Sequence, residues 1–494
     1  MAKSASQMEK AFPPRPKGQP AYRWLYTSLR DEILSSRLRP GARLPATRDL
    51  ARQYGLARGT IVSAFEQLKS EGYIEGSVGS GTYVSDVLPD ELLRAASPEN
   101  QRSPRRSPRR HLSKYARRTR LFEGYEPGPI CAFRANLPAV NLFPIRIWTH
   151  LTARCWKRAS QAHLMGCDAL GYLPLRRAVA DYLVSSRGVK CEAERVAIVS
   201  GVQEAIDLVT RLLLNPGDTV CVEDPGYPGA VRAFQAAGAR LCTVRQDEDG
   251  IRIADVPSKD VRLLYITPGH QFPLGTTMSL ARRLQLLEWA RRSGAVILED
   301  DYDGEYRYAG RPIPALQGLD PRGLVLYAGS FSKVLFPSLR LGYLVLPVDL
   351  VERVEAMKSL TNRHAPVIDQ ILLTTFIEEG HFGRHLRRMR EVYAERLSVL
   401  IDEARLRLGE LVEVSPVQAG LQTVGWMGSG IGAEAAAAAA LKRGVVVTPL
   451  QRYYSGKGKL RAGLQLGFAA LDVREIRRGV RELAIALADL APPA

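Results

Sequence analysis

The sequence has few cysteines for its length, and their spacing excludes several classes of protein. Six cysteines occur in 494 residues, and none of them forms a Cys-x-x-Cys pair. We therefore expect no zinc ribbon, dithiol redox site or disulfide-stapled fold, and no metal is predicted. The chain also lacks an apolar run long enough to span a membrane, and its first residues lack the apolar core of a secretion signal. These absences predict a cytoplasmic protein without a membrane partner. The length of 494 residues predicts two or three domains.

Acidic residues are also scarce relative to basic ones, and the imbalance is uneven along the chain. There are 51 Asp+Glu against 69 Lys+Arg, a formal net charge of +18. Residues 1–120 hold 23 basic and 11 acidic residues, a net +12, whereas the other 374 residues carry only +6. A basic N-terminal quarter indicates an acidic polymer as partner, most simply nucleic acid. The alternative is a merely solvated charged surface, and the pattern of segments decides between the two.

Residues 20–87 have the pattern of a winged helix-turn-helix domain. Residues 22–36 carry apolar side chains at the three-and-four spacing of an amphipathic helix. Residues 47–55 and 57–72 follow as two further helices joined through a glycine-containing turn, with Thr47 expected to cap the first. Two short strands around a glycine-rich tip complete the wing. A simple helical packing module is the alternative, but it does not explain the combination of wing, turn and charge.

DNA recognition would use the N-terminus of the last of these helices, where free N–H groups and the helix dipole favour phosphate. An arginine there suits guanine or phosphate, and a glycine allows close approach. Arginines around the first short helix and the wing glycines suit the DNA backbone and a groove. The predicted DNA-binding residues are Arg43, Thr47, Arg48, Arg58, Gly59, Thr60, Ser80 and Gly81. The string LPATRDLARQYGLARGTIVSAFEQLKSEGYIEGSVGSGTYV resembles the GntR-type winged helix along its whole length.

Residues 88–125 form an Arg/Pro/Ser-rich linker. The repeated Ser-Pro-Arg-Arg string has almost no apolar side chains, so it cannot bury enough surface to fold alone. We expect an extended tether.

Residues 126–494 alternate short β-rich runs with helical stretches, which predicts an α/β fold with buried parallel strands, residues 342–347 among them. Ligands of such sheets bind where the strands end. Asp300 suits a ring-nitrogen cation, Tyr302 a phenolic oxygen, and Lys333 among small hydroxyl residues an internal aldimine beside a phosphate clamp. Each residue alone is more often structural, but jointly they indicate pyridoxal 5'-phosphate. The predicted cofactor-binding residues are Lys333, Asp300, Tyr302, Tyr227, Gly201, Val202, Gln203, Ser330, Ser332 and Arg340, with Lys333 also the catalytic residue.

The strings EDPGYPG, TPGHQFPLG, ILEDDYDGEYRY, GSFSKVLFPSLRLGY and GHFGRHLRRMREVY resemble the MocR-type branch of the GntR regulators. In that branch a winged helix is fused to a domain similar to fold-type I aminotransferases. The resemblance implies that Lys333 forms the Schiff base, Asp300 contacts the pyridine nitrogen, Tyr302 the ring hydroxyl, and Ser330 and Arg340 the phosphate. It also implies a domain-swapped homodimer on an operator with repeated half-sites.

The chain departs from a working aminotransferase at the substrate end. Phe272 stands where aminotransferases usually have an asparagine, and Gly166 and Cys167 stand near the place of a partner-reaching tyrosine. Gln465 replaces the arginine that grips an α-carboxylate, with Arg461 as a possible substitute and both as candidate effector-binding residues.

Three functions fit these features. The first is a pyridoxal-phosphate-dependent transcription regulator that senses the cofactor, an amine or an amino acid through the aldimine, with at most residual transaminase activity. The second is an active aminotransferase with a DNA-binding appendage. The third, a pure architectural DNA binder, is disfavoured because the cofactor residues are all present.

Overall fold

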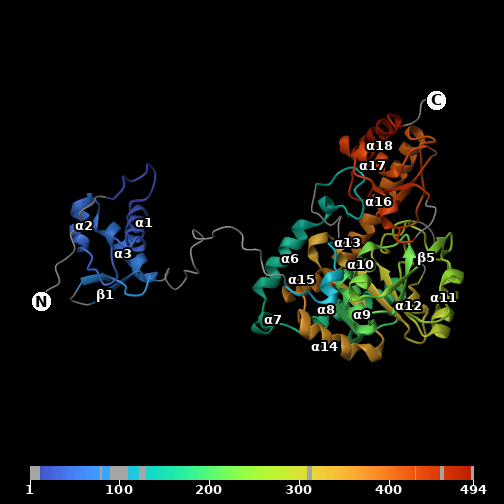
Figure 1. Ribbon diagram of the computed structural model, residues 1–494, viewed down its shortest axis with the longest axis horizontal. Helices are drawn as coiled ribbons and strands as arrows, with labels where there is room; N and C mark the ends of the chain where they lie inside the picture. Colours follow the sequence, from blue (N-terminus) through green and yellow to red (C-terminus); the bar gives the residue numbers. More distant parts are fainter. Residues whose placement is uncertain are drawn as a thin grey trace. The chain divides into compact units, whose positions relative to one another are not determined.

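The computed structural model describes residues 12–77, 81–88, 110–121, 129–308, 314–428, 430–456 and 461–490 (Figure 1). The chain divides into two compact units, residues 1–110 and residues 111–494. Each unit has its own hydrophobic core.

The smaller unit is the predicted winged helix. Its elements are α1 (Ala21–Leu34), α2 (Thr47–Tyr54), α3 (Arg58–Ser70), β1 (Ile74–Ser77) and β2 (Gly81–Val84), the strands pairing antiparallel. The periodic side chains of α1 and α3, such as Leu29 and Ile61, are fully buried in one core. Helix α2 ends at Gly55, whose φ of +62° suits glycine. The expected capping role of Thr47 is wrong, because the last extended residue is Ala46 and Thr47 is already helical.

The end of the predicted linker folds onto the larger unit. Residues Lys114–Arg118 form the short helix α5, whose first turn is capped by the Ser113 hydroxyl. Arg118 Nη1 donates to the backbone O of Ala237 at 3.4 Å, at the end of helix α10 (Pro228–Ala237). An extended tether therefore does not describe α5. Residues 89–109 and 122–125 of the predicted linker lie outside the described residues.

An eight-stranded sheet forms the centre of the larger unit. Its order is β3 (Val196–Val199), β10 (Gly342–Val345), β9 (Val325–Ser330), β8 (Val296–Asp301), β7 (Val261–Ile266), β4 (Thr219–Asp224), β5 (Arg240–Asp247) and β6 (Gly250–Ile251). Strands β9, β8, β7, β4 and β5 are parallel neighbours, as predicted. The expectation of a parallel strand at 342–347 is wrong, because β10 runs antiparallel to both β3 and β9. The chain between β9 and β10 is too short for a parallel crossover.

Helices cover both faces of this sheet. Successive residues of a strand point to opposite sides, so Ala197 and Val199 of β3 pack with α9 and α10, whereas Val196 and Ile198 pack with α8 and α15. The helices of this part are α6 (Ile145–Lys157), α7 (Gln161–Met165), α8 (Leu173–Arg187), α9 (Val202–Leu213), α10, α11 (Leu280–Ser293), α12 (Leu316–Leu319), α13 (Phe331–Val334), α14 (Val351–Thr361) and α15 (Val367–Glu378). Short 3-10 turns are η2 (Val140–Leu142), η3 (Ala193–Arg195), η4 (Ile253–Asp255), η5 (Pro337–Leu339), η6 (Val348–Leu350) and η7 (Leu450–Tyr453).

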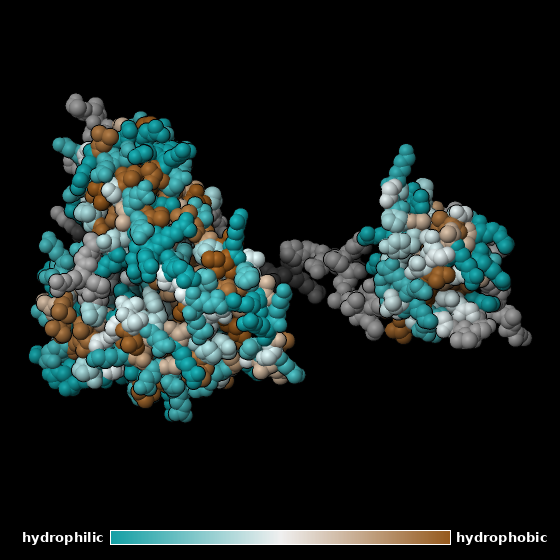
Figure 2. Space-filling model, turned by 180° about the vertical axis from the view of Figure 1, so that it is seen from behind, coloured by the Kyte–Doolittle hydropathy of each residue, from teal (hydrophilic) through white to brown (hydrophobic). Residues whose placement is uncertain are grey.

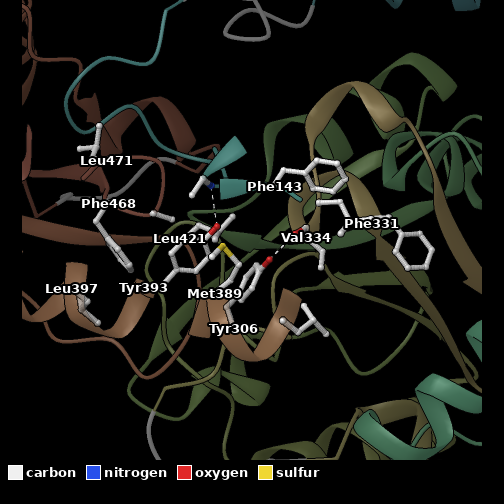
Figure 3. Packing of buried hydrophobic residues seen from close by; sticks show 14 of the residues in the cluster. Phe143, Tyr306, Phe331, Val334, Met389, Tyr393, Leu397, Leu421, Phe468 and Leu471 are labelled. Atoms are coloured by element: carbon white, nitrogen blue, oxygen red, sulfur yellow. Dashed lines mark hydrogen bonds between the residues drawn. The ribbon is translucent and has the colours of Figure 1, made fainter. Parts of the chain in front are cut away.

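The C-terminal part adds a smaller antiparallel sheet. Its strands lie in the order β11 (Val412–Val414), β12 (Gln422–Met427), β14 (Gly463–Gly467) and β13 (Thr448–Pro449), packed with α16 (His381–Arg407), α17 (Ala433–Lys442) and α18 (Val473–Ala488). One continuous core joins this part to the large sheet, with Met389 and Tyr393 of α16 beside Leu421 and Phe468 (Figure 3).

The surface of the larger unit is mainly hydrophilic on the face shown in Figure 2, where hydrophobic residues lie in separate groups. Throughout the described ranges, no helix is both long enough and apolar enough to cross a membrane.

Candidate cofactor and DNA-binding sites

Lys333 lies in the short helix α13, directly after strand β9. Its Nζ donates a hydrogen bond to the backbone O of Asn136 at 2.9 Å. Burial lowers the pKa of Lys333 to about 8, although the Asp303 and Asp300 carboxylates act to raise it. A lysine that is partly neutral near pH 7 is a competent nucleophile.

The backbone beside Lys333 is held by side chains from two other segments. The Tyr306 hydroxyl donates to the backbone O of Val334 at 2.6 Å (Figure 3), and His385 Nε2 lies 3.3 Å from the same oxygen. Tyr306 is fully buried, and His385 belongs to α16. The position of Lys333 is thus fixed by the core.

Asp300 is a buried carboxyl near the end of strand β8. Its Oδ2 accepts a 2.6 Å hydrogen bond from the Tyr265 hydroxyl, and its Oδ1 has no partner among the described residues. Burial raises the pKa of Asp300 to about 7, against the Tyr265 hydrogen bond, which lowers it. A protonated ring nitrogen opposite Oδ1 would satisfy this carboxylate.

Tyr302 belongs to a buried triad that the sequence reasoning only partly found. Its hydroxyl lies 3.0 Å from His270 Nδ1, and Asp303 Oδ1 lies 3.0 Å from the same nitrogen. Asp303 Oδ2 also accepts a hydrogen bond from the backbone N of Leu421 at 3.2 Å. His270 and Asp303 were not predicted, although His270 lies in the loop after strand β7 and Asp303 in the loop after β8.

The predicted phosphate-binding residues lie at the ends of three adjacent strands, β3, β10 and β9. Gly201 precedes helix α9 with a φ of +100°, and a Cβ built on it would lie 3.4 Å from the guanidinium nitrogens of Arg340. The helix N-terminus and the arginine therefore meet, as a phosphate site requires. Ser330 Oγ accepts from the backbone N of Ser332 at 3.2 Å, and Ser332 Oγ has no partner in the described part of the chain.

The remaining predicted cofactor residues join an aromatic group. Val202 and Gln203 begin α9, and the Tyr227 hydroxyl donates to Gln203 Oε1 at 3.2 Å. The ring of Phe272 lies 5.7 Å from that of Tyr227 and 6.0 Å from that of Tyr302, measured between centroids. The Phe272 side chain therefore packs among rings and offers no hydrogen bond.

The predicted DNA-binding residues cluster at three positions of the smaller unit. Arg58, Gly59 and Thr60 are the first residues of α3, and Thr47 and Arg48 begin α2. Arg43 lies at the wing rather than at α2, because a Cβ on Gly81 would be 2.9 Å from Arg43 Nε. Ser80 lies outside the described residues.

Comparison with protein families agrees with both units. The model of the bacterial regulatory proteins, gntR family, matches residues 21–84, and that of aminotransferase class I and II matches residues 147–483. The probable rhizopine catabolism regulatory protein MocR of Rhizobium meliloti is 38% identical over 465 residues, which cover 94% of this chain and 93% of that protein. The chain belongs to the MocR-type GntR regulators.

Another relative and a solved structure are also similar to this chain. The HTH-type pyridoxine biosynthesis transcriptional regulator PdxR of Corynebacterium glutamicum is 29% identical over 91% of this chain and 92% of its own. The α-aminoadipate aminotransferase LysN of Thermus thermophilus, solved with N-(5'-phosphopyridoxyl)-L-leucine, is 30% identical with a TM-score of 0.70, over 77% of this chain and 97% of that one.

Pyridoxal phosphate is the cofactor of this MocR-type regulator. The residues present fit it: the unpartnered Oδ1 of Asp300 matches a ring N–H, and Gly201 and Arg340 together match a phosphate.

The two predicted effector-binding residues have different surroundings: Gln465 is buried and Arg461 is exposed. Gln465 of β14 is fully buried, and its Oε1 accepts a 2.7 Å hydrogen bond from the Tyr453 hydroxyl. The Tyr453 ring lies 5.1 Å from that of Phe272, so Gln465 adjoins the aromatic group. The assignment of Arg461 is wrong, because its exposed guanidinium pairs with Glu413 at 3.1 Å and lies over the Trp426 ring.

Proposed function

We propose that this regulator senses a small molecule at its pyridoxal phosphate site and alters its hold on operator DNA in response. The observation that carries the proposal is the pairing of a full cofactor set around Lys333 with an uncharged side chain, Gln465, where an aminotransferase grips its substrate. Relatives named for rhizopine catabolism and pyridoxine biosynthesis support small metabolites as effectors. The candidate classes are the cofactor itself, an amine and an amino acid.

The proposed roles of the cofactor residues follow from their positions. Pyridoxal phosphate, when bound, supplies an aldehyde that joins reversibly to primary amines. Lys333 would attach it, because its lowered pKa of about 8 leaves part of the amine neutral at pH 7. Asp300 would hold a proton on the ring nitrogen, and Arg340 would bind the phosphate beside Gly201.

Tyr302 would donate to or accept from the ring hydroxyl, and its own neighbours would hold it there. His270 Nδ1 lies 3.0 Å from the Tyr302 hydroxyl, and Asp303 anchors the imidazole. Because all three side chains are buried, water would not compete for these hydrogen bonds.

We also propose that the protein is a cytoplasmic, domain-swapped homodimer. Large apolar side chains remain exposed on α7 and at the end of α14: Leu164 is 64% exposed, Met165 81% and Leu360 86%. These segments adjoin each other, since a Cβ on Gly166 would lie 2.8 Å from His364 Nε2. A second copy covering this region would bury them and would carry two winged helices to two half-sites.

The route from the cofactor to the linker would run through α9. Helix α5 borders a groove of about 890 Å³ that is also lined by Ser200 and Glu204. Glu204 Oε2 accepts from the backbone N of Ser200 at 2.5 Å, and Glu204 Oε1 accepts from Lys358 at 3.0 Å. Ser200 directly precedes Gly201, so phosphate binding at Gly201 would shift Ser200 and Glu204 and thereby the groove that α5 borders.

The proposal is tested by one spectrum and one DNA titration. The purified protein should absorb near the edge of the visible range, and Lys333→Ala should remove this band. Arg58→Ala should weaken binding to operator DNA at two salt concentrations, whereas Arg37→Ala, an exposed arginine paired with Glu32, should not. A wild-type protein without the band would overturn the sensing role. Turnover of common amino acids at about 1–1,000 per second would instead indicate an aminotransferase.

A further inference from the structure

Two buried glutamines lie side by side at the substrate end of the site. Gln422 of β12 is 1% exposed and Gln465 of β14 is 0% exposed. In the strand register Val424 is opposite Gln465, and Gln422 is opposite Gly467. Gln422 and Gln465 are therefore diagonal neighbours on the same face of the sheet, about 7–8 Å apart.

The amide oxygens of both glutamines accept hydrogen bonds from groups near the cofactor site. Gln422 Oε1 accepts from the backbone N of Asn136 at 3.0 Å, and the backbone O of Asn136 accepts from Lys333. Gln465 Oε1 accepts from Tyr453, whose ring contacts Phe272. With each oxygen engaged, each NH₂ group is directed elsewhere.

The nitrogen atom of Gln465 has no hydrogen-bond partner among the described residues, and that of Gln422 has none at good geometry. The Gln422 amide nevertheless lies close enough to the Tyr302 hydroxyl to act as a donor, which opposes the rise that burial causes in the pKa of that tyrosine. A buried amide N–H without a partner bears the full penalty of desolvation, so it favours a ligand that brings an acceptor. Two such donors on one face suit hydroxyl or carbonyl oxygens on one small molecule.

The charge of the surroundings argues against a carboxylate as that acceptor. After burial itself, the carboxyls of Asp303, Asp300 and Glu223 raise the pKa of the neighbouring Tyr302, so the field at the Tyr302 hydroxyl is negative even though Lys333 and Arg340 belong to the same site. Arg461, the cation nearest in sequence, is engaged by Glu413 on the exposed side. A negative field attracts an ammonium group and repels a carboxylate.

We propose that the effector is an amine that carries hydroxyl or carbonyl oxygens and no α-carboxylate, and that Nε2 of Gln422 and Nε2 of Gln465 bind those oxygens. This inference rests on the proposed sensing function and narrows its effector from three classes to one.

The experiment compares ligands of one carbon skeleton on the cofactor-loaded full chain. Serinol has a hydroxymethyl group where L-serine has its carboxylate. We expect serinol to shift the cofactor absorbance with a Kd at least about tenfold lower than that of serine. Calorimetry should also show that serinol binds more tightly than serine. Gln422→Leu and Gln465→Leu should each weaken serinol binding roughly fivefold, the share of one neutral hydrogen bond. Gln235→Leu, at an exposed glutamine of α10, should not.

A gain-of-function variant keeps the test decisive if a leucine variant does not fold. Gln465→Arg should reverse the preference in favour of serine, because an arginine fork binds carboxylates. Tighter binding of serine than of serinol by the wild type would overturn the inference, as would unchanged serinol binding in both leucine variants. If the wild type shows no cofactor band, the proposed function fails instead, so the two failures are distinguishable.

Discussion

The two ends of the cofactor site are built from opposite kinds of group. At the cofactor end, ionisable side chains from separate strands converge: Lys333 after β9, Asp300 on β8 and Arg340 before β10. At the effector end, the neutral Gln422 and Gln465 lie on the smaller sheet. Charged groups are costly to bury unless a partner charge is present. The cofactor brings such charges to the first end, whereas the two amides at the second end favour a neutral acceptor.

This contrast separates holding a cofactor from processing a substrate. A transaminase needs its substrate held in register with the reacting carbon, usually by charged groups that bind the α-carboxylate. The regulator keeps the residues that fit the cofactor and has amides at the other end. Binding without efficient turnover is what a sensor requires, since its signal depends on occupancy. Four measurements test this contrast.

The largest expected effect is at Asp300. Asp300→Ala removes the carboxylate opposite the ring nitrogen, which would leave a buried ring cation without a partner. Breaking a buried pair costs about 3–5 kcal/mol, so cofactor affinity should fall on the order of a hundredfold or more. A fluorescence titration of cofactor into the cofactor-free protein measures it. The control is Asp218→Ala, because Asp218 lies just before β4, at the N-terminal end of that strand and away from the cofactor residues. An Asp300→Ala affinity equal to that of the control would show that the carboxyl is only structural.

The next effect is the pH dependence of cofactor attachment. Lys333 reacts when neutral, and its pKa is lowered from 10.5 to about 8. The neutral fraction therefore rises from about one tenth at pH 7 to about nine tenths at pH 9, a tenfold increase in attachment rate that levels off above pH 9. Stopped-flow mixing of cofactor with the cofactor-free protein gives this profile. A rate that kept rising tenfold per unit up to pH 10 would show that the lysine is unperturbed.

A smaller effect separates the phosphate cradle from general backbone strain. Gly201 and Gly217 have similar φ angles of +100° and +97°, but only a Cβ at Gly201 would meet another group, the Arg340 guanidinium at 3.4 Å. Alanine at either position costs about 1–2 kcal/mol of backbone strain. Both variants should therefore lower the thermal midpoint, but only Gly201→Ala should weaken cofactor binding, by roughly five- to tenfold. Equal cofactor affinities in the two variants would argue against a phosphate at α9.

Strand-end residues were predictable from the sequence because parallel strands deliver their ends to one edge. Asp300, Tyr302, Ser330 and Lys333 each lie near or directly after such an end, and the structure brings them into one region. His270 lies further along, in the loop after β7, so the rule would have found it only if extended to the loops beyond the strand ends. Its partner Asp303 accepts a hydrogen bond from the backbone N of Leu421, a contact distant in the sequence.

The errors have local physical causes. Arg461 was proposed as a substitute because it lies close to Gln465 in the sequence, but β14 begins only at Gly463, so residue 461 lies outside the strand that carries Gln465. The direction of β10 depends on the short connection after β9 rather than on its apolar residues. Helix α5 was hidden by arginine-rich composition, since its stability comes from packing on α10 rather than from an apolar face of its own.

The smallest expected effect on cofactor affinity is at α5, the described end of the predicted linker. Tyr115 and Arg118 line the groove shared with Ser200 and Glu204, so Tyr115→Ala would loosen the linker end without touching the cofactor residues. Cofactor affinity should stay within about twofold of the wild-type value. In the wild type we expect ligand to change operator affinity by a coupling free energy of typically about 1–3 kcal/mol, and in Tyr115→Ala this change should fall below about twofold. DNA titrations with and without serinol measure this coupling, and Leu121→Ala, at a residue 84% exposed just beyond α5, is the control. If the coupling survives in Tyr115→Ala, the signal reaches DNA by another route, because α5 is the described segment through which the linker contacts α10.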